Sequence, residues 1–280
     1  MIERVHGLSR AAPILLIVAL AIAWQAPDVG WLRPASTDSE GAARMTSVLD
    51  ALVDEPLVLI GFDPDVGTYA EIRPTVRALL ADLLARDGRL AFVSLTAEGR
   101  ALASAEIARL GRVEANPTRL LDLGFIPGAE AGLVDLTGDI RVDEGDDGVL
   151  AREVEGAGIA AVDAILVIGG IDLGPRSWVE QVIPRITEVP LLTVTPTVLL
   201  PEVQPYLVGG QLAAGLITPR DGAAYRQVLE LDNLERLVEP MESRQLPILV
   251  GMLIAVAVLG QALASRTLAR VRSAGSRSVG

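Results

Sequence analysis

The sequence predicts an α/β domain built on a mostly parallel sheet of five or six strands, with an apolar segment on either side of it. Short apolar runs bounded by Gly, Pro or Asp alternate with segments of helical periodicity across residues 43–240. Runs of this kind, separated by helices, are typical of a parallel sheet that helices cover on both faces. We therefore expect one Rossmann-like, three-layer domain over residues 43–240.

The expected elements follow one another in regular order along the chain. The predicted strands cover residues 57–62, 90–95, 119–125, 164–168, 190–194 and 214–217. The predicted helices cover residues 43–53, 72–88, 97–111, 175–186, 197–207 and 220–239. Pro74 and Pro175 suit first helical turns, while Gly88 and Gly111 suit helix ends.

The amino-terminal segment, residues 1–32, is either a membrane anchor or a secretory signal. Its apolar stretch, residues 11–24, would reach about 21 Å as a helix, which is short for a membrane span. Extension through the following residues to residue 32 would make it an anchor. Alternatively, the preceding arginines, the apolar middle and the small residues at 21–23 form a signal peptide that is cleaved.

The carboxyl-terminal apolar stretch, residues 246–264, is predicted to be a transmembrane helix. It would reach roughly 28 Å, close to the hydrocarbon thickness of a bilayer. The tail at 265–280 contains arginines and no acidic residue. Because arginines precede the first apolar segment and follow the second, both termini are expected in the cytoplasm and the main domain outside the cell membrane. Cleavage of the first segment would leave a single-pass protein.

The charge of the chain argues against a nucleic-acid partner. Residues 25–264 contain 18 arginines against 35 acidic residues, a net charge of −17. A domain of this charge repels nucleic acid and anionic lipid head groups. The partners that we expect are the lipid bilayer and other membrane protein subunits, or further copies of the chain.

The residue types that the chain lacks exclude several classes of catalysis. It has no lysine and no cysteine, and its one histidine, His6, precedes the first apolar segment. A phosphate-loop lysine, a Schiff base, Ser-His-Asp and Cys-His relays and the usual zinc sites are therefore excluded from the main domain. Chemistry there would depend on carboxylates, hydroxyls, arginine, backbone amides or an oxygen-bound metal such as Mg²⁺.

Ligands of such folds bind beyond the carboxyl ends of the strands, which directs attention to the loops there. The candidate ligand- or cofactor-binding residues in these loops are Thr96, Gly128, Gly169, Gly170, Asp172 and Thr195. Glycines let backbone amides approach a ligand at a helix start. Tight strand-to-helix turns need the same residue types for backbone reasons alone, so no cofactor is predicted.

The stretch GFDPDVGT, residues 61–68, resembles the first motif of phosphotransferases of the haloacid dehalogenase type. The resemblance implies that Asp63 would attack phosphorus and that Asp65 would act as acid and base, with Ser94 or Thr96 in the second motif. Asp139 and Asp143 have the spacing of that family's Mg²⁺-binding acids.

This sequence departs from the phosphotransferase pattern in three respects. Thr68 comes five residues after Asp63 rather than four, no basic residue is identified for the phosphoryl group, and further strand–helix units follow Asp143. The alternative interpretation is a turn, in which Pro64 stiffens the chain and Gly67 gives it conformational freedom.

A second resemblance extends over roughly residues 43–230. The stretches GFDPDVGT, LDLGFIPG and GGQLAAGLITPRDGAAY occur in the order found in an uncharacterised family of membrane-anchored Rossmann-like α/β proteins. The likeness is lost at residues 137–157, an acidic interval that we interpret as a surface excursion, with a cation site as the alternative. This resemblance implies the fold and the membrane anchoring, and it carries over no catalytic residue.

Three functions follow as expectations. The first is a non-catalytic, membrane-anchored module that assembles with other membrane or envelope proteins. The second is a Mg²⁺-dependent phosphatase, which requires the four carboxylates of Asp63, Asp65, Asp139 and Asp143 to converge. The third is a sensor that holds a small ligand in a concave pocket at the strand ends.

Overall fold

The computed structural model describes residues 39–231, apart from 114–116, 139, 141, 143–147, 156–157, 171–172 and 187–188. The membrane segments predicted at 1–32 and 246–264, and the tail at 265–280, lie outside the described residues. Among the residues that are described, no helix is both long enough and apolar enough to cross a bilayer.

The described chain contains a six-stranded sheet in which every strand is parallel to its neighbours. The strands are β1 (Leu57–Asp63), β2 (Arg89–Ser94), β3 (Leu120–Phe125), β4 (Ala164–Gly169), β5 (Leu191–Val194) and β6 (Ala214–Leu216). Their order in the sheet is β3-β2-β1-β4-β5-β6. The predicted Rossmann-like α/β fold is thus confirmed, with six strands and an all-parallel sheet.

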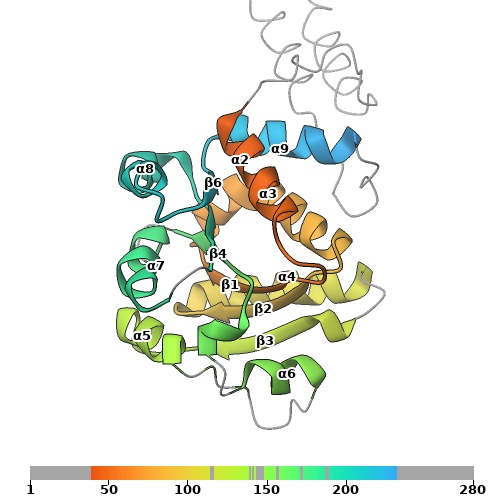
Figure 1. Cartoon of the computed structure of the whole chain (residues 1–280), viewed down its shortest axis with the longest axis vertical. Helices are drawn as coiled ribbons and strands as arrows, with labels where there is room; N and C mark the ends of the chain where they lie inside the picture. Colours follow the sequence, from red (N-terminus) through yellow and green to blue (C-terminus); the bar gives the residue numbers. More distant parts are fainter. Residues whose placement is uncertain are drawn as a thin grey trace, which may run out of the picture. The chain divides into compact units, whose positions relative to one another are not determined.

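Helices cover both faces of this sheet (Figure 1). The first group is α2 (Glu40–Asp50), α3 (Val66–Ala85), α4 (Ala97–Val113) and α9 (Pro219–Leu231). The second is α5 (Glu130–Gly138), α6 (Val149–Val154), α7 (Pro175–Gln181) and α8 (Leu200–Val208). The crossover helices α3 and α4 lie on one face and α7 and α8 on the other, because the chain turns in opposite directions after β1 and after β4 and right-handed crossovers then fall on opposite faces. α2 and α9 complete the first face, and α5 and α6 complete the second.

The central strand β1 separates the two apolar cores. Val58, Ile60 and Phe62 point into the core beneath α3, α4 and α9. On the other face, Gly61 leaves room for Trp178 of α7, since a Cβ atom there would lie 2.3 Å from the Trp178 ring. This glycine is therefore required for close packing, and the strand around it is completely buried.

Two of the predicted helix ends are wrong. Pro74 lies inside α3 rather than in its first turn, because the Asp65 carboxylate caps the helix start further upstream. α4 continues past Gly111 to Val113, and a Cβ atom at Gly111 would have no neighbour within 4 Å. Pro175 does begin α7, and Gly88 does follow the end of α3, as predicted.

Candidate functional site

The candidate site lies where the strand order reverses, at the carboxyl ends of β1 and β4. These strands are neighbours although α3 to α6 separate them in the chain, and Asp63 lies opposite Gly169 in their register. Such a switch point is where open parallel sheets most often bind ligands. The predicted residues Thr96, Gly170 and Thr195 are in contact with this region, as the following hydrogen bonds and close approaches show.

Asp63, the last residue of β1, is a buried acid with two unequal oxygens. Its Oδ1 accepts hydrogen bonds from the Leu95 N–H at 2.7 Å, the Thr96 N–H at 2.9 Å and the Thr96 hydroxyl at 3.1 Å. Its Oδ2 is buried and has no hydrogen-bond partner among the described residues. Burial raises the pKa of Asp63 to about 6, although the three hydrogen bonds act to lower it. Asp63 therefore attaches β1 to the loop between β2 and α4.

Asp65 is the capping residue of α3. Its Oδ1 accepts from the Thr68 N–H at 2.9 Å, and its Oδ2 accepts from the Thr68 hydroxyl. These two bonds lower the pKa of Asp65, so its carboxylate is held in the charged form. A carboxylate in this position satisfies a backbone donor of the first helical turn and interacts favourably with the helix dipole.

Thr96 has the same capping role for α4. Its hydroxyl accepts from the Gly99 N–H at 3.0 Å while it donates to Asp63. Gly99 is in close contact with the end of β1, since a Cβ atom there would lie 2.3 Å from the Phe62 carbonyl oxygen. Of the two hydroxyls predicted for a second motif, Thr96 contacts Asp63, whereas the buried Ser94 hydroxyl has no partner among the described residues.

The glycines after β4 are packed against neighbouring loops. A Cβ atom on Gly169 would lie 2.7 Å from the Cα of Gly174, and one on Gly170 would lie 3.2 Å from the Asp63 carbonyl oxygen. The Gly170 N–H donates to that carbonyl at 3.3 Å, and the Thr195 hydroxyl donates to the Gly169 carbonyl at 3.2 Å. These contacts hold the start of the loop after β4 against the Asp63 backbone, the Gly174 backbone and the end of β5.

Gly128 lies apart from this cluster, in the turn between β3 and α5. Its φ of 104° is in the region that favours glycine, and its carbonyl accepts from the Ala131 N–H at 3.0 Å. The same turn is joined to β2 by the Ile126 N–H, which donates to the Ser94 carbonyl at 2.9 Å.

The remaining predicted acids, Asp139, Asp143 and Asp172, lie outside the described residues. Within the described part of the chain, no three acidic or histidine side chains are arranged to hold a metal ion. Asp63 and Asp65 supply two carboxylates near the switch point, and both accept hydrogen bonds from the chain itself.

Two hollows open elsewhere on the domain. One, of about 110 Å³, lies near the ends of β5 and β6 and is lined by Thr195, Thr218, Glu71 and Arg226 among others. The other, of about 210 Å³, lies between α2 and α8. Both are smaller than the roughly 300 Å³ of an ordinary small-molecule site.

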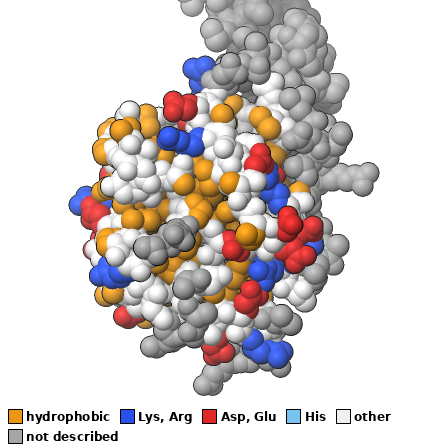
Figure 2. Space-filling model, in the orientation of Figure 1, with side chains coloured by type: hydrophobic (Ala, Val, Ile, Leu, Met, Phe, Trp, Pro, Cys, Tyr) orange, Lys and Arg blue, Asp and Glu red, His pale blue; other side chains and the backbone are white. Residues whose placement is uncertain are grey.

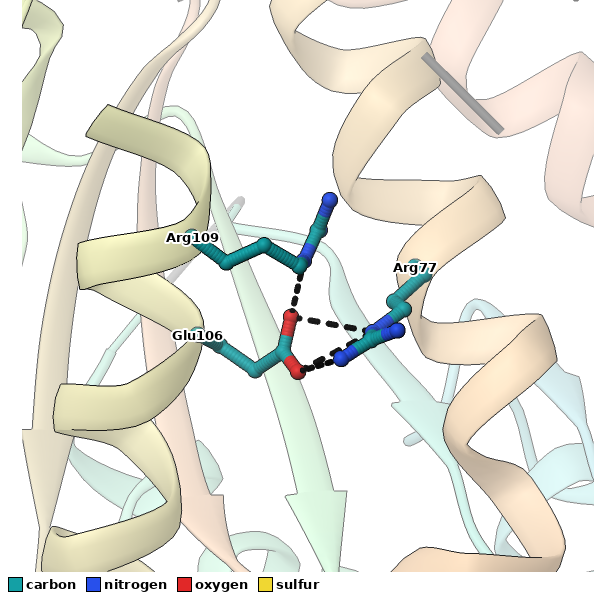
Figure 3. Close-up of polar contacts among 3 residues, drawn as sticks. All are labelled: Arg77, Glu106 and Arg109. Carbon is teal, nitrogen blue, oxygen red and sulfur yellow. Dashed lines mark hydrogen bonds and ion pairs between the residues drawn. The ribbon is translucent and has the colours of Figure 1, made fainter. Parts of the chain in front are cut away.

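A buried ion triad between α3 and α4 was not predicted from the sequence (Figure 3). Glu106 is 2% exposed and accepts from Arg77 Nη2 at 2.7 Å and from Arg109 Nε at 2.6 Å. Burial acts to raise the pKa of Glu106, but the bonds from the two arginines outweigh it and the pKa lies below its ordinary value. The spacing of Glu106 and Arg109 was visible in the sequence, whereas the contact with Arg77 depends on how the two helices pack.

No protein-family model, no curated protein and no solved structure matches this chain. The resemblance to the uncharacterised membrane-anchored family therefore stays a prediction.

Proposed function

We propose that the protein is a non-catalytic, membrane-anchored α/β module that assembles with other membrane or envelope proteins. The apolar segments on either side of the domain support the anchoring. The observation that carries the proposal is the engagement of both carboxylates of the Asp63-Pro64-Asp65 turn. Residues that would face a substrate in an enzyme are here bound to the backbone of their own domain.

The hydrogen bonds of Asp63 and Asp65 give both acids a structural role that requires no catalytic reaction. Asp65 uses both oxygens to hold Thr68 at the start of α3. Asp63 is 4% exposed and uses one oxygen to hold the loop after β2. A nucleophile and an acid/base pair need free oxygens within reach of a reacting group. Three of the four oxygens accept hydrogen bonds and the fourth, Asp63 Oδ2, is buried, which favours a structural role.

The packing of the glycine loops likewise favours a module over a small-ligand sensor. Gly169 and Gly170 are packed closely against the backbone of Gly174 and Asp63 rather than facing an open space. A sensor would need an open crevice lined by these loops. A side chain at Gly169 would collide with the Gly174 backbone, which accounts for glycine at that position.

The proposal is tested by extracting the full-length protein from native membranes in a mild detergent. Native gel electrophoresis, with mass spectrometry of the co-migrating proteins, then identifies the assembly. We expect discrete co-migration with other membrane subunits in a fixed ratio. Migration of the protein alone, as a monomer, would contradict the proposal.

One observation favours a second candidate, the Mg²⁺-dependent phosphatase. The Asp63 Oδ2 atom has no partner among the described residues, and it belongs to an acid whose pKa is raised to about 6 at the switch point. The test is hydrolysis of p-nitrophenyl phosphate by the purified full chain with Mg²⁺. Activity that Asp63→Asn abolishes and Asp87→Asn retains would establish this candidate. Asp87 is a suitable control because it lies in an exposed turn after α3, at the opposite end of the strands from Asp63.

A further inference from the structure

The groove between α2 and α8 combines apolar walls with a polar rim. Its volume is about 210 Å³, and the edge strand β6 lies at its base. The residues that line it are Glu40, Gly41, Arg44, Leu200, Gln204, Leu207, Val208, Gly215, Ile217 and Asp221. The aliphatic side chains come mainly from α8, and the charged ones come from α2 and the start of α9.

Val208 is the most conspicuous apolar residue of this groove. It ends α8 and is 82% exposed, more than any other large apolar side chain among the described residues. Figure 2 shows apolar side chains exposed over much of one face of the domain. An exposed aliphatic residue is ordinary by itself, but one at the mouth of an apolar groove provides a contact for a partner.

One wall of the groove is packed closely against the sheet. A Cβ atom on Gly41 would lie 2.8 Å from the Gly215 carbonyl oxygen, so α2 lies directly against β6. The Ser39 hydroxyl, at the start of α2, donates to Asp221 at 2.5 Å. The first described residue is thereby fixed beside the groove, and no large rearrangement is needed to open the groove to a partner.

If the chain is anchored as proposed, only a short stretch of sequence separates the anchor from Ser39. The predicted anchor ends at residue 32, which leaves residues 33–38 as the tether. At a maximum of about 3.5 Å per residue, Ser39 then lies within roughly 25 Å of the end of the anchor. The juxtamembrane segment of a neighbouring membrane protein is therefore within reach of the groove.

We propose that the α2–α8 groove docks the extracytoplasmic juxtamembrane segment of a transmembrane partner. This inference rests on the proposed function and identifies the surface through which the domain would bind its partner. The segment would present an aliphatic side chain to Leu200, Leu207 and Val208, with basic residues beside it. The basic residues complement Glu40 and Asp221, which outnumber Arg44 among the lining residues, and the net charge of −17 that residues 25–264 carry.

A bilayer surface fits this groove less well than a protein segment does. A concave site of about 210 Å³ takes up a protruding side chain, whereas a lipid surface would touch only the rim. The acidic domain also repels anionic head groups. The observations therefore favour a protein segment.

The first test compares Val208→Glu with Val53→Glu in the full-length protein. Val53 is 60% exposed and follows the far end of α2, roughly 16 Å along the helix from Glu40. After extraction from native membranes, we expect Val208→Glu to lower the recovery of co-migrating partner at least tenfold. Val53→Glu is expected to leave recovery within twofold. Circular dichroism verifies that both variants are folded.

The outcomes separate this inference from the proposed function. If the unmodified protein has a partner that Val208→Glu retains, the function stands and the groove is not the contact surface. If the unmodified protein has no partner, the proposed function itself fails. A complex that contains only copies of this chain would overturn the assignment of a different partner.

The second test uses the absence of cysteine from the chain. Val208→Cys and Val53→Cys each provide a single attachment site for a short cross-linker and for a polarity-sensitive dye. In native membranes, we expect position 208, and not position 53, to cross-link to the partner that Val208→Glu loses. A blue shift of the dye at position 208 in lipid nanodiscs that contain the purified protein alone would show contact with lipid and overturn the proposal.

Discussion

Asp63 is a buried acid whose position is determined by backbone donors. Three hydrogen bonds to its Oδ1 attach the end of β1 to the loop after β2. Burial nevertheless outweighs these bonds and raises the pKa of Asp63 to about 6. At neutral pH the buried carboxylate of Asp63 is therefore charged, which lowers the stability of the folded state. The same carboxylate accepts the hydrogen bonds that hold the loop.

Replacing Asp63 by Asn tests this balance, because an amide keeps the acceptor and removes the charge. The folded pKa of about 6 is above the ordinary value of 3.8, so the folded state holds a proton that the unfolded state has already released. The stability that this group contributes is therefore present at low pH and is lost as the pH rises towards and through 6. From pH 4.5 to 7.5, the free energy of unfolding of Asp63→Asn should rise by about 2 kcal/mol relative to the unmodified domain.

Urea titrations of both proteins at pH 4.5 and 7.5 measure this difference, and the other titrating groups cancel in the comparison. A difference that does not change with pH would show that Asp63 is not protonated preferentially in the folded state. A difference that changes in the opposite direction would show that its hydrogen bonds outweigh burial.

Part of the candidate site was predictable from single residues. The contact between Asp63 and Thr96 followed from the parallel sheet, because the ends of neighbouring strands lie together at one edge. The capping roles of Asp65 and Thr96 are local, since each accepts from an N–H three residues further on. The packing of Gly169 and Gly170 against other loops depends on distances between segments that the sequence does not contain.

At the scale of elements, the six strands were predicted within about two residues because uniform apolar runs mark strands that are buried on both sides. Helix ends were less predictable. α3 begins before Pro74 since Asp65 provides a strong cap, and the interior of α4 tolerates Gly111. α5 and α6 were missed because they are short and follow the turn signals of residues 126–148.

The triad of Arg77, Glu106 and Arg109 joins α3 to α4, and its removal should weaken the packing of these elements. Glu106→Gln would leave two arginines, with side chains 15% and 16% exposed, without their shared counter-charge. We expect the free energy of unfolding to fall by about 3–5 kcal/mol, because breaking a buried pair leaves uncompensated charge.

Urea unfolding at pH 7.5 measures the loss, and Glu180→Gln is the matched control. Glu180 pairs with Arg176 within α7 at 3.0 Å, but both side chains are exposed, so little change is expected. Equal effects of the two substitutions would contradict the assignment of the triad as a structural ion cluster.

At the scale of the whole molecule, the fold explains how one domain can be stable without disulfides. The chain contains no cysteine, and each face of the sheet is covered by its own apolar core. The groove between α2 and α8 was not predictable from the sequence, because α2 and α8 are more than 140 residues apart in the chain.

The central claim is that the protein acts by assembling with other proteins and that Asp63 has a structural role in the fold. The most direct measurement is native mass spectrometry of complexes extracted from membranes that contain either the unmodified full chain or Asp63→Asn. We predict the same partners in the same ratio for both. Detection of the unmodified protein only as a monomer, or loss of the partners in Asp63→Asn, would contradict the claim.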